Sequence, residues 1–303
     1  MDYKNSAFYN LQSKRRLSAL LLIPHSISKL KGLSTDSNYI VRKKESRNKY
    51  GQIKIRQIEE PKPDLKKIHS RIKDLLNKLD YPSYVHSGQK YLSYKTNAEA
   101  HIDNDHVTNI DIASFFPSCT YSSIRDLFVN KFNTSLDIAC LIAKLCTTNS
   151  HLPTGSPVSQ IMALLLTYDM LEEINTLLNP LDILMTVYVD DITLSSNTQI
   201  NKSTIHQVIT VINKYGFKVK AAKLKSFPVA NQKEITGVII HDKKLHAPNK
   251  RKRKVIELAK IKNPTEKELR SLFGRISEIQ YVEDNKTFST LKKKIKSAID
   301  KAA

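Results

Sequence analysis

The stretch Ile183-Leu-Met-Thr-Val-Tyr-Val-Asp-Asp-Ile-Thr-Leu-Ser195 decides the fold of this chain. It contains two β-type runs, 183–189 and 192–195, which are separated only by Asp190 and Asp191. This pattern predicts a tight hairpin with both carboxylates at its turn. Adjacent like charges repel each other, and water or a bound cation relieves that repulsion. Aspartate is also common in ordinary polar turns, so this pair alone favours a plain turn over a metal site.

A second acidic position changes that balance. Asp111 ends an apolar strand that we expect at 107–112, within Asn109-Ile-Asp-Ile112. Two neighbouring strands that each deliver a carboxylate at one end can hold a pair of divalent ions, which in two-metal sites lie roughly 3.5–4 Å apart. Magnesium prefers such oxygen ligands and uses substrate phosphates as further ones. Taken together, the two strands favour a site for two Mg²⁺ ions.

Composition indicates a globular protein with an anionic partner. Of the 303 residues, 40% are hydrophobic, and 49 Lys and Arg stand against 29 Asp and Glu, which gives a formal charge of +20. Nucleic acid is the partner that best suits basic residues spread over a long surface. Cys119, Cys140 and Cys146 form no CxxC pair or zinc spacing, so we expect them to be reduced and buried.

Apolar runs in this sequence are short. The run Leu17 to Ile23 is too short to span a bilayer and too late for a signal peptide. We therefore expect a cytoplasmic protein with no membrane partner.

The rest of the chain mixes helices and strands, with no internal repeat. Residues 1–35 are basic and helical in pattern, runs at 39–44 and 52–58 predict a hairpin with a basic tip at 48–51, and a helix follows from Asp64. Further on we expect helices at 121–131, 136–147, 201–214 and from Pro157 through Leu171, with a strand pair near 217–240.

The segment from residue 248 onward is helical and basic, with sixteen Lys and Arg against seven Asp and Glu. Thr265-Glu-Lys-Glu268 has the form of a capping box. The helix that begins there carries apolar residues on one face. Its basic residues can be interpreted as the solvated face of an amphipathic helix or as a phosphate-binding surface.

Five segments together resemble the motifs of the reverse transcriptases, in the order of that family. They are the fingers segment Lys54-Ile-Arg56, motif A from Asp111 to Ser118, the turn His151-Leu-Pro-Thr-Gly-Ser-Pro-Val-Ser159, motif C Tyr188-Val-Asp-Asp191, and motif D from Tyr215 to Lys223. The resemblance implies an α+β right-hand polymerase fold, with fingers, a palm with an antiparallel sheet, and a helical thumb. We expect N-terminal helices and fingers at 1–105, a palm with finger insertions at 106–245, and a basic thumb at 246–303.

The same resemblance implies roles in catalysis. Asp111, Asp190 and the backbone carbonyl of Ile112 would bind two Mg²⁺ ions, with Asp191 in support. Arg56, with either Lys49 or Lys54, would grip the triphosphate. Three further residues complete the nucleotide site that the resemblance implies. Phe116 would crowd the sugar 2′ position, Thr154 would contact the sugar, and Lys223 would donate a proton to pyrophosphate.

Two further segments resemble signatures of the retron reverse transcriptases. They are Asn97-Ala-Glu-Ala-His101 before motif A and Ile235-Thr-Gly237 after motif D. We expect RNA contacts from Asn97, His101, Thr236 and Gly237. The sequence also ends soon after the basic helical segment, where intron and retroviral enzymes would continue, and this favours a retron enzyme.

A retron enzyme implies further partners. The first is a structured non-coding RNA, which serves as the template and supplies an internal guanosine 2′-hydroxyl as the primer. The others are its RNA–DNA product, deoxynucleoside triphosphates, and an effector or toxin protein in antiphage defence. The thumb residues expected to clasp the duplex through phosphates and 2′-hydroxyls are Lys250, Arg251, Lys252, Arg253, Lys254, Arg270 and Arg275.

Three alternatives stay open at this point. They are another bacterial reverse transcriptase, such as a group II intron enzyme, a non-catalytic RNA-binding scaffold, and an RNA-templated RNA polymerase. The chain also departs from the family pattern, because Thr154 stands where most relatives have Gln, Ser156 replaces Ala, Gln160 replaces a common Pro and Val189 replaces a frequent Ala. These departures bear on contacts to the nucleotide and leave all three aspartates in place.

Overall fold

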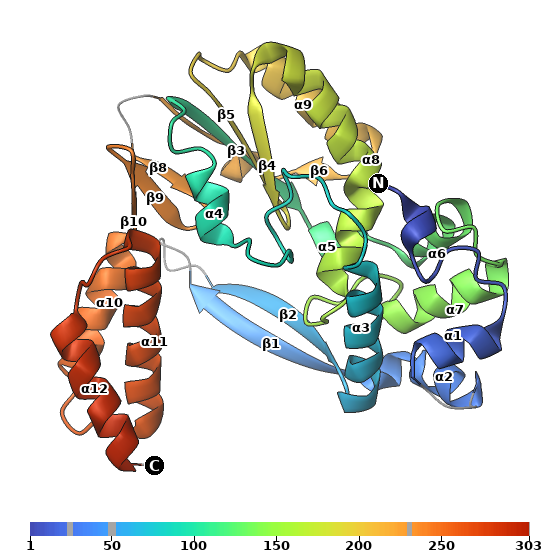
Figure 1. Cartoon of the computed structure of the whole chain (residues 1–303), viewed down its shortest axis with the longest axis horizontal. Coiled ribbons are helices and arrows are strands. Elements are labelled where there is room, and N and C mark those ends of the chain that lie inside the picture. The colour runs from blue at the N-terminus through green and yellow to red at the C-terminus, as the bar shows by residue number, and fades with distance from the viewer. Residues whose placement is uncertain (23–26, 48–52, 229–231, 303) are drawn as a thin grey trace.

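The computed structural model describes residues 1–22, 27–47, 53–228 and 232–302 (Figure 1). It confirms a mixed α+β chain. The α-helices are α1 Lys14–Leu20, α2 Ile27–Leu33, α3 Pro63–Leu76, α4 Tyr94–Glu99, α5 Phe115–Ser118, α6 Tyr121–Asn130, α7 Leu136–Cys146, α8 Ser159–Leu178, α9 Lys202–Lys214, α10 Asn249–Ala259, α11 Glu266–Glu283 and α12 Ser289–Ala302. The strands are β1 Tyr39–Arg47, β2 Ile53–Pro61, β3 His106–Ala113, β4 Leu184–Tyr188, β5 Asp191–Ser196, β6 Lys218–Val219, β7 Lys225–Phe227, β8 Lys233–Ile235, β9 Val238–His241 and β10 Lys244–His246.

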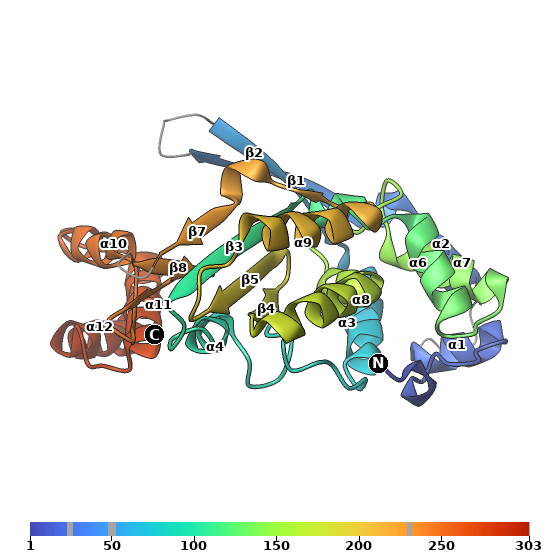
Figure 2. The same ribbon diagram turned by 90° about the horizontal axis from the view of Figure 1, so that it is seen from above.

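The central sheet is antiparallel and has the order β4-β5-β3-β6, with β7 also paired to β3. Because side chains alternate along a strand, its two faces differ sharply. Met185 and Val187 on β4, with Ile192 and Leu194 on β5, are buried on one face. Figure 2 shows α8 and α9 lying along the sheet on this side. The opposite face therefore carries the polar residues of the same strands.

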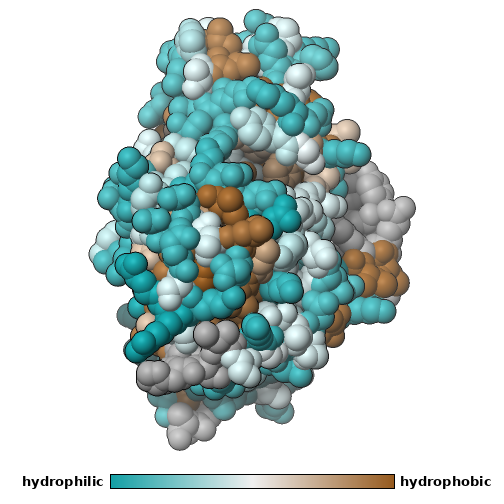
Figure 3. Space-filling model, turned by 90° about the vertical axis from the view of Figure 1, so that its right-hand side faces the viewer, coloured by the Kyte–Doolittle hydropathy of each residue, from teal (hydrophilic) through white to brown (hydrophobic). Residues whose placement is uncertain are grey.

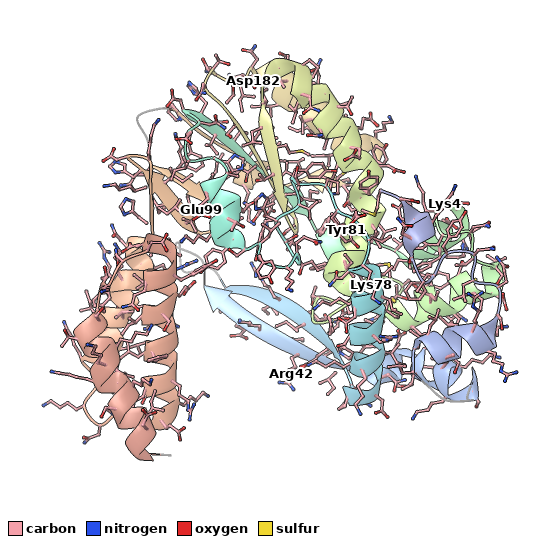
Figure 4. All side chains as sticks on the ribbon, viewed as in Figure 1. Lys4, Arg42, Lys78, Tyr81, Glu99 and Asp182 are labelled. Atoms are coloured by element: carbon pink, nitrogen blue, oxygen red, sulfur yellow. The ribbon has the colours of Figure 1, made fainter. Side chains whose placement is uncertain are left out.

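The hairpin of β1 and β2 is longer than the sequence pattern predicts. Its register runs from Tyr39 opposite Pro61 to Arg47 opposite Ile53. The expected tip at 48–51 lies outside the described residues. The hairpin lies below the sheet in Figure 1, between α3 and the C-terminal helices, and Arg42, labelled in Figure 4, marks β1.

The turn at 152–158 docks onto β2. Thr154 donates a hydrogen bond from its hydroxyl to the Gln57 carbonyl at 2.8 Å, and the Gly155 amide donates to the Glu59 carbonyl at 3.1 Å. A Cβ atom at Gly155 would meet that same carbonyl oxygen at 2.8 Å and Ile58 Cγ2 at 3.0 Å. Only glycine allows this close approach of the two backbones.

The helices α10, α11 and α12 form a C-terminal bundle with a hydrophobic core of its own. This core joins bundle residues such as Ile276 and Ile279 to Ile235, Val238 and Ile240 of the β8–β9–β10 sheet. It therefore crosses position 245, where we expected one domain to end and the next to begin. The capping box predicted at Thr265 and Glu268 is present at the start of α11.

Apolar side chains gather inside the molecule and leave its outside polar. On the face that Figure 3 shows, hydrophilic residues predominate, and hydrophobic ones form small patches near its centre, at its top and at its right-hand edge. None of the helices within the described ranges is long and apolar enough to cross a membrane.

Most of the expected elements are confirmed, and two more differ in extent besides the β1–β2 hairpin. The helix expected through Leu171 continues to Leu178. The region expected to hold one strand pair, 217–240, contains the short strands β6, β7, β8 and β9. Strands of two to four residues are too short to show an alternating pattern in sequence, and they form because neighbouring strands supply their hydrogen bonds.

Substituting Gly155 by Ala tests the contact between the 152–158 turn and β2. We expect Gly155→Ala to lower the free energy of unfolding by about 1–3 kcal/mol, because the backbones must separate. Gly274→Ala is the matched control, since a Cβ there meets nothing within 4 Å on the exposed side of α11. That control should raise stability by about 1 kcal/mol. Urea denaturation of both variants measures the difference, and equal effects would contradict the close contact.

Candidate active site

The two central strands place Asp111 and Asp191 directly opposite each other. Asp111 on β3 pairs with Asp191 on β5 in the antiparallel register. Opposite residues of such a pair share a face, so both carboxylates lie on the polar face of the sheet. Asp111 is buried and Asp191 is half-buried. The convergence predicted from two separate stretches of sequence is therefore present.

Asp190 joins them through the hairpin turn between β4 and β5. Tyr188 and Asp191 are paired, so Val189 and Asp190 form a two-residue turn. Val189 has φ +60°, a conformation that a β-branched residue rarely adopts. The Val189 amide donates to Ser87 Oγ at 3.0 Å, and the Ile112 amide donates to the Asp190 carbonyl at 3.0 Å. These two bonds fix the strained turn against its surroundings.

The electrostatics at the hairpin turn are unfavourable for the charged forms of Asp190 and Asp191. Burial raises the pKa of Asp191 to about 6, and the charges of Asp190 and Asp111 add to the effect. Burial also raises the pKa of Asp190, with the charge of Asp111 acting in the same direction. Three carboxylates so close together are stabilised by a cation.

Lys223 provides one such cation within the chain. Its ammonium group is bonded to the carboxylate of Asp111. Burial alone would lower the pKa of Lys223, but the hydrogen bond to Asp111 and the charges of the three aspartates raise it. The expected motif D lysine is thus brought to the carboxylates.

The chemistry of this group of side chains fits divalent ions. Within the described ranges, no group of three or more His, Cys, Asp and Glu side chains could hold a metal ion as the structure stands. Asp111 is buried and Asp190 and Asp191 are half-buried, and Asp111 attracts an ammonium group. An open, all-oxygen set of this kind suits Mg²⁺, which keeps waters and shares substrate ligands.

Of the expected nucleotide-binding residues other than Lys223, Arg56 is the one whose charge acts on these carboxylates within the described residues. Arg56 is exposed on β2, and its positive charge acts to lower the pKa of Asp190. Phe116 on α5 is half-buried, 5.5 Å from the ring of Phe115. Thr154 is exposed, with its hydroxyl engaged by β2. Lys49 and the side chain of Lys54 lie outside the described residues, so their roles stay predictions.

The segment around Asn97 and His101 is packed inside the protein. His101 is fully buried, with Nδ1 2.6 Å from Ser195 Oγ and Nε2 2.6 Å from Thr186 Oγ1. It therefore bridges β5 and β4 on the polar face of the sheet. Asn97 is also fully buried. Both side chains are engaged or enclosed by protein, so a direct contact with RNA stays a prediction that requires this segment to open.

The second retron-like segment forms a turn that contacts the first. Thr236 and Gly237 connect β8 to β9, both with positive φ, which is the geometry of a type I′ hairpin turn. Asn97 Nδ2 donates to Thr236 Oγ1 at 3.5 Å, and Thr236 Oγ1 donates to the Tyr94 carbonyl at 3.0 Å. The two signatures thus meet in space, although about 140 positions separate them in sequence.

This junction is also where the C-terminal bundle is attached. A Cβ atom at Gly237 would meet Arg251 Nη2 at 2.7 Å. From α4, which Glu99 marks in Figure 4, Lys95 donates to Asp284 at 2.5 Å. The Tyr281 hydroxyl lies 2.8 Å from Ser93 Oγ. The helix α4 therefore connects the central sheet to the bundle.

The expected RNA-binding residues of the bundle divide into two groups. Arg251 and Lys252 are half-buried and paired with Glu278 at 2.8 Å and Glu283 at 2.6 Å. The others are exposed: Lys250, Arg253, Lys254, Arg270 and Arg275. Of these, Lys254 and Arg270 also contact glutamates on their own helices. The exposed group is available for phosphates, and the half-buried pair holds α10 to α11.

Sequence reasoning missed the residues that support the site. Ser87 holds the Val189 turn, and buried Glu59 lies 3.2 Å from His151 Nε2. His69 lies beneath the 152–158 turn, 2.5 Å from Ser156. No motif contains Ser87, Glu59 or His69, but a lone glutamate or histidine at an otherwise apolar position is a signal that the sequence does offer.

Comparison with known proteins agrees with this geometry. Residues 41–240 match the family model described as Reverse transcriptase (RNA-dependent DNA polymerase), and the chain belongs to this family. It is 30% identical over 175 residues to the Retron Se72 reverse transcriptase of Salmonella heidelberg (strain 579083-10), covering 56% of this chain and 46% of that protein. It is 26% identical over 196 residues to the Retron Ec86 reverse transcriptase of Escherichia coli, covering 63% and 60%.

A third relative is the Retron Ec73 reverse transcriptase of Escherichia coli, 30% identical over 137 residues, or 41% of this chain and 43% of that protein. The chain spans about half the length of the curated relatives it matches. The similarity to retron reverse transcriptases expected from the sequence is thereby confirmed.

Burial of His101 predicts a loss of stability in mild acid. Burial lowers the pKa of His101 from 6.5 to about 3, so the folded chain keeps the ring neutral while the unfolded chain protonates it near 6.5. The stabilisation is fully present above pH 6.5 and is lost as the pH falls toward 3. Between pH 7 and 5 the loss is about 2 kcal/mol.

Urea denaturation at pH 7, 6 and 5 measures this dependence. His101→Gln lacks the titrating ring, so its stability should fall by about 2 kcal/mol less than that of the unsubstituted chain over this range. His206→Gln is the control, because His206 is exposed on α9. Parallel curves for His101→Gln and the unsubstituted chain would contradict a buried neutral His101.

Proposed function

We propose that the chain is an RNA-directed DNA polymerase, and that it acts within a retron. The single observation that carries the proposal is the convergence of three carboxylates at the end of β3 and at the turn of the β4–β5 hairpin. Asp111 lies directly opposite Asp191 there. A scaffold that only binds RNA has no need for three neighbouring carboxylates, two of which, Asp190 and Asp191, have charged forms that burial and mutual repulsion disfavour.

The parts of the molecule take the roles of a right-hand polymerase. The central sheet with α8 and α9 serves as the palm, the β1–β2 hairpin with α3, α6 and α7 as the fingers, and the α10–α12 bundle as the thumb. The hairpin and the bundle both lie below the sheet in Figure 1, and in this proposal an RNA–DNA duplex would be held between them.

Asp111, Asp190 and the carbonyl of Ile112 would hold two Mg²⁺ ions, with Asp191 in support. Ions bound there would neutralise charge on the transferring phosphate and lower the pKa of the primer hydroxyl. Arg56, whose charge already reaches Asp190, binds the triphosphate together with Lys49 or Lys54.

The remaining residues select and release the nucleotide. Phe116 crowds the sugar 2′ position and thereby rejects ribonucleotides. Lys223 carries a proton for the departing pyrophosphate, and its bond to Asp111 keeps it beside the carboxylates. Thr154 takes the place next to the sugar through the turn that docks on β2.

The retron proposal rests on the named relatives and on the junction of Asn97 with Thr236. In this role the chain copies part of a partner non-coding RNA into single-stranded DNA, starting from an internal guanosine 2′-hydroxyl. The exposed basic residues of α10 and α11 hold the RNA through its phosphates. The complex belongs to an antiphage system in which an effector protein is held in check.

Expression of the chain with its native flanking DNA tests both parts of the proposal. We expect the purified protein to carry a short DNA of defined length, linked to RNA until a debranching enzyme cuts it. The Asp190→Asn and Asp191→Asn variants should carry the RNA and no DNA, because they lose the metal-binding charge and keep the basic surface. Separate RNase and DNase digestion of the bound nucleic acid measures this.

Each alternative gives a different result. RNA alone in both the unsubstituted chain and the variants would indicate a scaffold. DNA of ragged length with no link to RNA would indicate a reverse transcriptase outside a retron. Asp182→Asn is the control, because Asp182 lies in the turn before β4 at the far end of the sheet (Figure 4) and should leave the product unchanged.

A further inference from the structure

A buried histidine supports the 152–158 turn from below. His69 on α3 is fully buried, with Nδ1 2.5 Å from Ser156 Oγ and Nε2 2.6 Å from the Leu145 carbonyl oxygen. The Tyr39 hydroxyl donates to the same carbonyl at 3.2 Å. One ring thus connects the turn to α7, and through that carbonyl to the start of the β1 strand.

The partners of His69 determine where its proton lies. A carbonyl oxygen can only accept, so Nε2 carries the hydrogen and donates it to Leu145. Burial lowers the pKa of His69 to about 4, so the ring is neutral at pH 7 and Nδ1 is an acceptor. The Ser156 hydroxyl therefore donates to Nδ1, while its oxygen accepts from the Val158 amide at 3.3 Å. Both hydrogen-bonding functions of Ser156 are used.

We infer that Ser156 and His69 are a positioning pair that sets the backbone of Thr154 and Gly155, and through it the affinity for the incoming deoxynucleoside triphosphate. The inference rests on the proposed function, which assigns this turn to the nucleotide. Neither residue reaches the carboxylates, so their effect is on binding and not on the chemical step.

Two observations connect the pair to the nucleotide site. Ser156 follows Gly155 directly, and Gly155 has no space to move toward β2, because Glu59 and Ile58 already touch it. The Thr154 hydroxyl is held by Gln57. The turn is therefore fixed on one side by β2 and on the other by His69, and loss of either support lets it shift. An alanine at 156 would leave Nδ1 of the buried His69 without the hydrogen bond that Ser156 donates.

The test measures nucleotide binding without the chemical step. The chain is loaded with poly(rA)·oligo(dT) whose primer ends in a dideoxynucleotide, and dTTP with Mg²⁺ is titrated to give its Kd. Ser156→Ala should raise the Kd for dTTP by about tenfold, because a buried acceptor loses its partner. The Kd for the duplex itself should stay unchanged, which a general loss of folding would not allow.

A double-variant cycle separates the pair from two independent effects. In a His69→Phe background, Ser156→Ala should bring no further weakening, since the partner is already gone. Thr167→Val is the matched control, because it removes a buried hydroxyl of α8 that bonds only within its own helix. It should leave the Kd for dTTP within twofold of that of the unsubstituted chain.

Every outcome decides the inference. An unchanged Kd in Ser156→Ala, or effects that multiply in the double variant, would overturn it. If the unsubstituted chain binds dTTP but never extends an unblocked primer, the proposed polymerase activity is wrong. The Kd values for dTTP then still show whether Ser156 and His69 position the turn. If it binds no dTTP, the turn is not a nucleotide site and the inference is wrong.

Discussion

The antiparallel register that sets Asp111 opposite Asp191 is the constraint on which the rest of the structure depends. Burial of the other face of the sheet enforces it, because Ile110, Ile192 and Leu194 are fully buried. A slip of one residue would turn these apolar side chains toward the substrate face and the aspartates into the core. The hydrophobic packing under α8 therefore fixes which atoms meet on the polar face, and it holds together charges that would otherwise separate.

The surrounding elements limit how that face can be used. The hairpin brings the charge of Arg56 toward Asp190, and the 152–158 turn locks the same hairpin through Gly155. On the other side, the segment of α4 contacts the central sheet through His101, the β8–β9 turn through Asn97 and the C-terminal bundle through Lys95. The two segments that resemble retron signatures thus act as a buried joint between the sheet and the bundle. Their sequence pattern can reflect this junction as well as any contact with RNA.

The sequence predicts this site well where polar residues interrupt apolar strands. Asp111 stands out because Ile110 and Ile112 flank it, and the pair Asp190 and Asp191 stands out because it separates two apolar runs. The sequence does not show what buries Asn97 and His101, since an isolated short helix gives no sign of its tertiary partners. The sequence shows a lone histidine at position 69 but not its partners, Leu145 and Ser156, which lie far away in the chain. A contact that a single side chain makes with a residue far away in the chain leaves no local pattern in the sequence.

The most direct test of the central claim is the rate of dTTP and UTP incorporation on poly(rA)·oligo(dT), with Mg²⁺ and with a chelator. The three carboxylates predict synthesis that stops when the metal is removed, and Phe116 predicts a strong preference for dTTP over UTP. Incorporation of UTP as fast as dTTP would show an RNA polymerase instead. A complete lack of synthesis in Mg²⁺ by the folded chain, with its RNA bound, would contradict the account.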